Sequence, residues 1–274
     1  MPPILCVHLL RQVDGHLIDL LRSLSPAEWE LQTIAPLWRV RDVAAHLLDT
    51  ALRKLSLVRD GCSVEVVEIR SPQDVVALVN RLNREGVTVY RRLSPPVLID
   101  LMTIACRQSA EFHESLDPFA PAAFAVSWAG EDQSLNWFDT ARELTQRWHH
   151  QQQIRLATNR PGIMEPELYH PVLDCFLRGL PFRYRDTNAP EGTAILVEIS
   201  GESGGRWKLV RKPAGWELVD DTSGEAAARV TIPQDLAWRI FTKGIDRATA
   251  HELVQMDGDQ TLGEKLLHLT AIVA

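Results

Sequence analysis

The first 160 residues of the chain carry apolar side chains at a helical period. In residues 4–24 leucine and valine recur at intervals of three and four residues, which places them in one stripe along a helix. Residues 116–137 show little periodicity, and we expect a loop there. Similar stripes, separated by breaks such as Ser94-Pro95-Pro96, predict further helices over 40–58, 73–93, 97–115 and 138–159. Long helices with modest connections predict an antiparallel four-helix bundle.

The hydrophobic period changes after Gly162, where alternation of apolar and polar residues begins to predict β-strands. Glycine-containing turns between the first four strands are typical of a meander of hairpins. The expected elements are a helix over 166–180, strands over 194–200, 206–211, 215–219 and 227–232, a helix over 234–243, a short strand over 252–257 and a helix over 260–273. Consecutive strands followed by helices indicate an α+β fold. We therefore expect two domains, an all-α bundle over 1–162 and an α+β domain over 163–274.

Composition narrows the classes of function. The chain has 274 residues, which suits two domains, and its 29 Lys and Arg against 36 Asp and Glu give a net charge of −7. An acidic chain without a basic run is a poor candidate for nucleic-acid binding. No stretch approaches the ~20 apolar residues that span a bilayer, and no basic segment precedes an N-terminal apolar stretch as in a signal peptide. Four widely separated cysteines favour reduced thiols, so we expect a cytoplasmic protein without membrane partners.

The histidines carry the candidate chemistry. His46 lies on the predicted helix 40–58 among apolar residues, either as a core histidine with one hydrogen bond or as part of a site. On the predicted helix 138–159, at 100° per residue, one narrow polar stripe contains Glu143, Gln146, His150 and Gln153. This stripe faces either solvent or a polar cavity inside the bundle. In the second case Gln146 and His150, one turn apart, can meet His46 in a three-ligand metal site with open positions. His149 is turned 100° from His150, so we do not expect both to bind one ion.

Several segments point to a known family. The run Trp38-Arg-Val-Arg-Asp-Val-Ala-Ala-His46 resembles the second-helix signature of the DinB/YfiT-like metal-binding bundles, and the run from His150 to Ala157 resembles their last-helix signature. The C-terminal part, with Asp235-Leu-Ala-Trp238-Arg239, is similar to the sterol-carrier-like α+β domain of the mycothiol-dependent maleylpyruvate isomerases. The resemblance covers nearly the whole chain and matches the order of the two predicted domains.

The resemblance implies a divalent metal, usually zinc, at His46, Gln146 and His150. It also implies a low-molecular-weight thiol, mycothiol or an analogue, whose pKa the metal lowers. The implied activity is that of an isomerase or a thiol transferase acting on a small molecule. Arg239 is the candidate catalytic residue of the second domain, because an arginine in a cleft binds an anionic substrate group. The alternative for Arg239 is a solvated surface arginine.

This chain departs from the family pattern at one ligand. Gln146 stands where the isomerases have glutamate, and a neutral amide is a weaker zinc ligand than a carboxylate. Three alternatives follow: the site binds a metal ion with Gln146 as a ligand, it uses Glu143 as a ligand instead, or it is degenerate and no longer binds metal. The functional alternatives are a non-catalytic small-molecule-binding or stress-response protein and a metal-dependent hydrolase that uses no thiol. No residue is recognisable as a specific ligand of a dicarboxylate, so the sequence does not identify the substrate. It does not determine the oligomeric state either, and a homodimer is one possibility.

Overall fold

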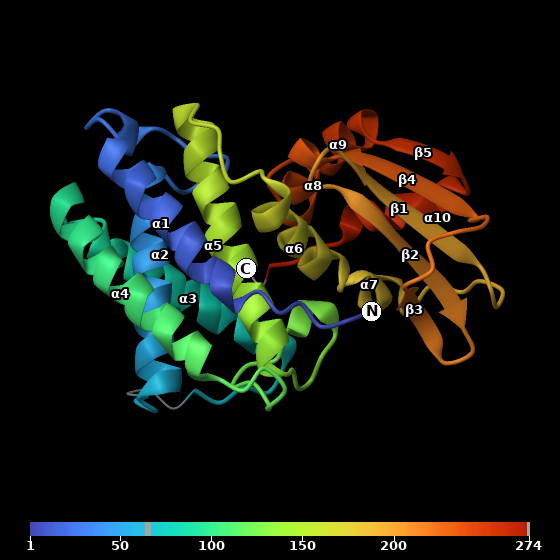
Figure 1. The fold of residues 1–274 in the computed structure, drawn as a ribbon, viewed down its shortest axis with the longest axis horizontal. Helices are drawn as coiled ribbons and strands as arrows, with labels where there is room; N and C mark the ends of the chain where they lie inside the picture. The colour runs from blue at the N-terminus through green and yellow to red at the C-terminus, as the bar shows by residue number, and fades with distance from the viewer. Residues whose placement is uncertain (64–66, 273–274) are drawn as a thin grey trace.

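The computed structural model describes residues 1–63 and 67–272, and its elements fall into a helical half and a mixed half (Figure 1). The helical half contains the long helices α1 (Val7–Ser23), α2 (Val40–Lys54), α3 (Pro72–Tyr90), α4 (Pro95–Ser115) and α5 (Asn136–Thr158). All five expected helices are present, with ends shifted by a few residues. The last turn predicted for the second helix is a π-helix, Leu55–Arg59, rather than α-helix. A membrane-spanning length of apolar helix is absent from the part of the chain described here.

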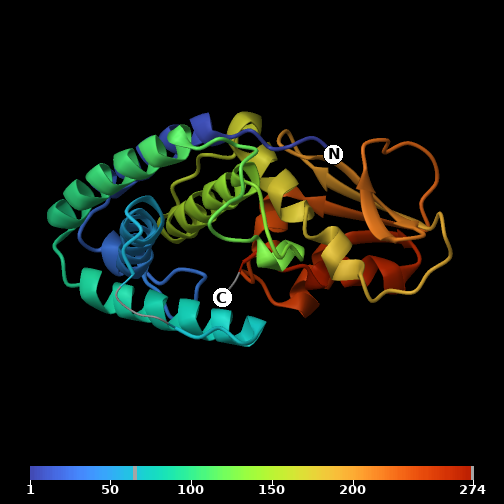
Figure 2. The same cartoon turned by 90° about the horizontal axis from the view of Figure 1, so that it is seen from below.

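Four of these helices make the bundle. Contacts join α1 to α4 and α5, and α2 to α4 and α5, whereas α3 packs along α2 at the edge (Figure 2). The close approach of α3 to α2 depends on Gly86, because a Cβ there would lie 2.2 Å from the side chain of Asp49. The expected four-helix bundle is therefore confirmed, with α3 as an added fifth helix.

The second half is α+β, as predicted. Its helices are α6 (Pro166–Leu177), α7 (Leu180–Tyr184), α8 (Gln234–Phe241), α9 (Arg247–Leu253) and α10 (Gln260–Glu264), and its strands are β1 (Ala194–Ser200), β2 (Gly205–Lys212), β3 (Gly215–Val219), β4 (Ala228–Pro233) and β5 (Gln255–Gly258). The strands form one sheet in the order β3-β2-β1-β4-β5. Helices α7, α8 and α10 contact the sheet, and its core side carries Ile195, Val197 and Ile199.

Several details of this half differ from the sequence prediction. Helix α9 was not expected, and the strand expected over 252–257 is β5, which begins only at Gln255. Strand β4 pairs with β1 in parallel, so the four strands are not a continuous meander: the chain returns across the sheet after β3. The expected helix over 260–273 ends earlier, since α10 stops at Glu264 and a 3₁₀ turn over Lys265–His268 follows, while residue 273 lies outside the described residues. Local alternation of side chains is the same for parallel and antiparallel neighbours, so it does not predict which edge a returning strand joins.

One hydrophobic core connects the two halves. It runs from the start of α1 through Trp148 of α5 and Tyr169 of α6 to the inner side of the sheet. The two rings stack with centroids 4.2 Å apart, and Trp148 Nε1 donates to the carbonyl of Ile163 at 2.7 Å. The proposed boundary between residues 162 and 163 falls in the connection from α5 to α6, where this contact ties the halves together. A second cluster fills the far end of the bundle.

Candidate functional site

Two histidines from different helices meet inside the bundle. The imidazole rings of His46 on α2 and His150 on α5 have centroids 4.6 Å apart. The ring of Trp38, in the loop that precedes α2, lies 4.6 Å from His46 and 5.9 Å from His150 and packs against both. His46 is 3 % exposed and His150 is 8 % exposed. The polar stripe of α5 therefore faces the interior of the bundle, and the solvent-facing alternative is wrong.

The hydrogen bonds of these rings indicate which nitrogens carry lone pairs. His150 Nδ1 lies 2.9 Å from the amide oxygen Oε1 of Gln153. Because that oxygen can only accept, His150 carries its proton on Nδ1 and keeps a free lone pair on Nε2. His46 Nδ1 is buried, and no hydrogen-bond partner for it exists among the described residues. Nε2 of His150 and Nδ1 of His46 are therefore both available to bind a ligand.

Burial keeps both rings neutral. It lowers the pKa of His150 to about 4, and the hydrogen bond that His150 donates to Gln153 opposes this shift. Burial is also the main cause that lowers the pKa of His46 well below its usual value, with the neighbouring His150 as the next cause. At neutral pH both imidazoles are unprotonated, which is the form that coordinates a metal ion.

His149 lies closer to this pair than its position on the helix suggested. Its ring centroid is 3.9 Å from that of His150, although the two backbone positions differ by 100°. His149 Nδ1 donates to the carbonyl of Thr145 at 2.8 Å, one turn back along α5. Side-chain rotation thus brings neighbouring rings together, and Nδ1 of His149 is already used by the helix backbone.

Gln146, the third expected ligand, lines a small cavity of about 10 Å³ one turn before His150. The other polar side chains in its lining include Asp14 of α1, Thr50 of α2 and Glu143 of α5, and neither histidine of the pair is among the lining residues. Within residues 1–63 and 67–272, no three His, Cys, Asp or Glu side chains are placed to hold one metal ion. The structure therefore brings His46 and His150 together and places Gln146 at a cavity that neither histidine lines.

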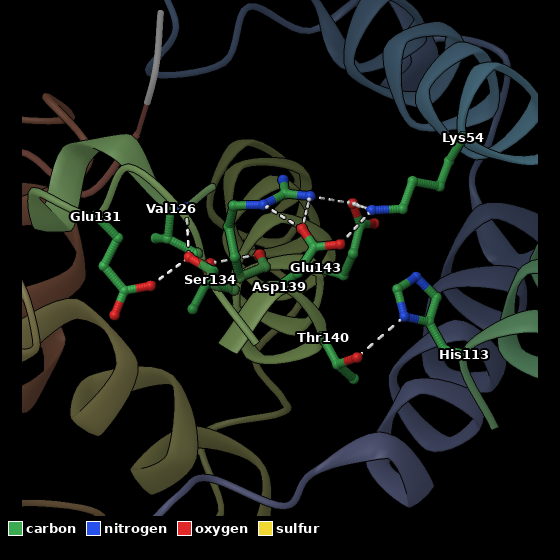
Figure 3. A network of polar contacts seen from close by, with 10 residues as sticks. Lys54, His113, Val126, Glu131, Ser134, Asp139, Thr140 and Glu143 are labelled. Atoms are coloured by element: carbon green, nitrogen blue, oxygen red, sulfur yellow. Dashed lines mark hydrogen bonds and ion pairs between the residues drawn. The ribbon is translucent and has the colours of Figure 1, made fainter. Parts of the chain in front are cut away.

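A buried ionic network that the sequence did not reveal lies toward the N-terminal end of α5 (Figure 3). Lys54 Nζ is 2.5 Å from Asp139 Oδ2 and 3.8 Å from Glu143 Oε1. The guanidinium of Arg142 contacts the same two carboxylates, each at 2.7 Å. One feature of the sequence could have indicated this network. Lys54 continues the inward stripe of α2 that contains Leu47 and Ala51. A charged residue in an apolar stripe indicates a buried partner of opposite charge.

The network removes Glu143 as a metal ligand. Burial raises the pKa of Glu143, but Arg142 and then Lys54 outweigh burial and hold the pKa well below its usual range. The carboxylate is ionised and bound to two cations, so recruiting it to the histidine pair would leave Lys54 and Arg142 buried with less compensation. We therefore exclude the alternative in which Glu143 replaces Gln146.

Further polar contacts cross-link the bundle around the site. Arg147 Nη1 lies 2.5 Å from Asp14 Oδ2 on α1, and Arg147 Nη2 donates to Ser109 Oγ on α4 at 2.7 Å. His113 of α4 lies 3.1 Å from the hydroxyl of Thr140, as Figure 3 shows. These contacts fix α5, which carries most of the candidate residues, to α1 and α4.

Arg239 lies in the second half, on α8, and is half-buried. Its Nε donates to the carbonyl of Asp235 at 3.1 Å, within its own helix. No hydrogen bond, ion pair or ring contact in the described part of the chain joins it to the histidine pair or to Gln146. It is near the loop that carries Trp38, since a Cβ on Gly244 would lie 2.8 Å from Ile34 Cδ1 and 3.4 Å from Arg239 Cα.

Comparison with known proteins identifies a family and a solved structure with a similar fold. Residues 10–155 match the family described as mycothiol maleylpyruvate isomerase N-terminal domain. The crystal structure of a histidine-to-alanine mutant of the mycothiol-dependent maleylpyruvate isomerase is similar to the chain at 12% identity and a TM-score of 0.55, covering 94% of this chain and 93% of that one. The crystal structure of the mycothiol-dependent maleylpyruvate isomerase has 13% identity and a TM-score of 0.49, with 88% of each chain covered. No curated protein gives a significant match.

Proposed function

The chain belongs to the family defined by the mycothiol maleylpyruvate isomerase N-terminal domain, and we propose from this membership that it is a metal-dependent enzyme that uses a low-molecular-weight thiol to isomerise a small molecule or to transfer the thiol to it. The observation that carries the proposal is the pair His46–His150. Two buried, neutral imidazoles lie edge to face, and one of them has a buried nitrogen without a hydrogen-bond partner among the described residues. This donor set fits a divalent cation such as zinc, for which imidazole nitrogen is a preferred ligand.

His46 and His150 would hold the ion, with the amide oxygen of Gln146 as the third protein ligand. When bound, zinc lowers the pKa of a thiol and supplies a thiolate nucleophile at neutral pH. Gln153 fixes the tautomer and orientation of His150, as the partners of metal-binding histidines generally do. Trp38 covers both rings and excludes water from that side.

The thiol in this proposal is mycothiol or an analogue, and the substrate is a small molecule with an acidic group. Arg239 binds that group, since its two terminal nitrogens make no hydrogen bond or ion pair with any described residue. Its place on α8, beside the loop that carries Trp38, supports a substrate approach from the side of the second half.

Metal content and thiol binding test the proposal without a known substrate. Protein purified without added metal is analysed for zinc, and its affinity for zinc is measured by competition with a chromophoric chelator at pH 7. A cobalt-substituted sample is then titrated with mycothiol, and a thiolate-to-cobalt absorption band is expected. Zinc binding without any thiol-dependent band would favour the thiol-independent hydrolase.

Gln146 favours a second candidate, a non-catalytic small-molecule-binding protein with a degenerate site. The amide carries no charge, and it lines a cavity that the two histidines do not line. In this case zinc affinity would stay at the level of a His46→Ala variant, and the cobalt band would be absent. Those two results together would overturn the enzymatic proposal.

A further inference from the structure

Helix α4 carries a stripe of exposed apolar side chains on the outside of the bundle. Val97, Leu101 and Ile104 are 46%, 39% and 49% exposed. Their spacing of four and three residues places them on successive turns along one side of the helix. In Figure 1 and Figure 2 this helix lies at the edge of the helical half, with α1 beside it. Single exposed apolar residues are normal on a protein surface, whereas a continuous stripe indicates a surface that binds a partner.

The stripe has no packing role inside the chain. The opposite side of α4 supplies Leu98 and Met102 to the cluster at the far end of the bundle, where both are buried. The three exposed side chains belong to neither of the two hydrophobic clusters of the described residues. The core therefore does not explain why this side of α4 is apolar.

Two charges of opposite sign lie on either side of Ile104. Asp100 and Arg107 are both exposed, and their separation of seven residues, about two turns, places them on one line of the helix. Within residues 1–63 and 67–272, Asp100 has no ion-pair or hydrogen-bond partner for its side chain. Arg107 lies 3.2 Å from Glu111 in an exposed pair, which contributes little to stability. Both charges are thus available to a partner.

A second copy of α4 in the antiparallel direction complements this pattern. A two-fold axis between positions 103 and 104 is about 5 Å along the helix from both Asp100 and Arg107. Because the axis reverses the helix direction, Asp100 of each copy faces Arg107 of the other, and the two copies of Ile104 meet beside the axis. A parallel arrangement would instead place Asp100 beside Asp100 and Arg107 beside Arg107. Charge complementarity therefore favours the antiparallel pair.

We propose that the outer side of α4 binds α4 of a second copy of the chain, in an antiparallel homodimer centred on Ile104. Two-fold symmetry uses the same patch on both copies, so one contact covers both apolar stripes. A contact of one helix from each copy is smaller than a standard interface, and we expect a dimer that dissociates on dilution. The proposal goes beyond the proposed function and does not depend on it.

Sedimentation velocity of the full chain tests the proposal. Between about 1 and about 500 µM, the sedimentation coefficient should rise from that of a monomer toward that of a dimer. Ile104→Lys places a charge beside the axis and should weaken the dimer at least about tenfold. The matched control is Leu253→Lys on α9, at an apolar residue that is 53% exposed, and it should leave the association unchanged. A wild-type protein that stays monomeric throughout, or equal weakening by the two variants, would overturn the proposal.

Charge reversal tests the antiparallel direction. Asp100→Arg and Arg107→Asp each bring like charges together across the contact, so each should weaken the dimer about tenfold. The double variant forms both ion pairs again with exchanged signs, and its association should return to within about threefold of the wild type. Thermal unfolding at a concentration where every variant is monomeric should give the same midpoint for all, which separates loss of the contact from loss of the fold. A double variant as weak as the single variants would rule out the pairing of Asp100 with Arg107 and with it the proposed dimer.

Discussion

The ammonium of Lys54 lies 2.5 Å from the carboxylate of Asp139, buried between α2 and α5 beside the candidate site. Glu143 and Arg142 complete the arrangement with one further charge of each sign. A buried ion pair contributes little compared with an apolar pair of similar volume, but removing one partner leaves an uncompensated charge. The network therefore makes the geometry of α5 sensitive to any single change among its members.

Lys54→Met tests this sensitivity. The variant leaves Asp139 and Glu143 to share Arg142, so we expect the free energy of unfolding to fall by about 3 kcal/mol, measured by urea denaturation. The matched control is Arg107→Ala on the surface of α4, where loss of the exposed pair with Glu111 should cost less than about 1 kcal/mol. An equal loss of unfolding free energy in the two variants would mean that the buried ion pair matters no more to stability than the exposed pair.

Stability should also depend on pH through His113. Burial lowers the pKa of His113 to about 4, while Glu143 opposes the shift. Below pH 6.5 the unfolded chain binds a proton that the folded chain takes up only near pH 4, so this group reduces stability as the pH falls through that window. The loss is roughly 3 kcal/mol in full. Urea denaturation at several pH values should show that the free energy of unfolding falls less steeply with decreasing pH in His113→Gln than in the wild type. The same dependence on pH in both proteins would contradict the role given to His113.

Zinc affinity should follow the proposed ligand set. His46→Ala and His150→Ala should each abolish stable binding in the chelator competition, since each removes an imidazole of the pair. Gln146→Glu should raise the affinity about tenfold or more, because a charged oxygen replaces a neutral one. The control is His170→Ala, an exposed histidine of α6 in the second half. An unchanged affinity in Gln146→Glu would remove Gln146 from the ligand set.

The shared core predicts that the two halves unfold together. Trp148→Ala removes a fully buried ring that stacks on Tyr169 and donates to Ile163, so we expect a loss of about 3–5 kcal/mol. In the wild type, far-ultraviolet circular dichroism and tryptophan fluorescence should report one coincident transition. Two separate transitions would show that the contact across the connection after α5 does not couple the halves.

Much of the fold follows from side-chain period alone. The stripes of apolar residues predicted α1, α2, α4 and α5 to within a few residues, because a helix that buries one side must repeat its apolar positions every three to four residues. The same reasoning placed Glu143, His150 and Gln153 on one line of α5. Alternation in the second half likewise identified β1 to β4, since successive side chains of a strand point to opposite sides of the sheet.

The partners of those side chains depended on the tertiary structure. Neither the spacing nor the composition indicated that Lys54 would meet Asp139, that the ring of His149 would contact that of His150, or that β4 would join β1 in parallel. Each of these contacts joins surfaces whose meeting depends on how elements distant in sequence pack, or on a side-chain rotation that backbone position does not determine. Period in the sequence determined which residues of each element lie inside, and packing between elements decided which of those residues touch and which charges are compensated.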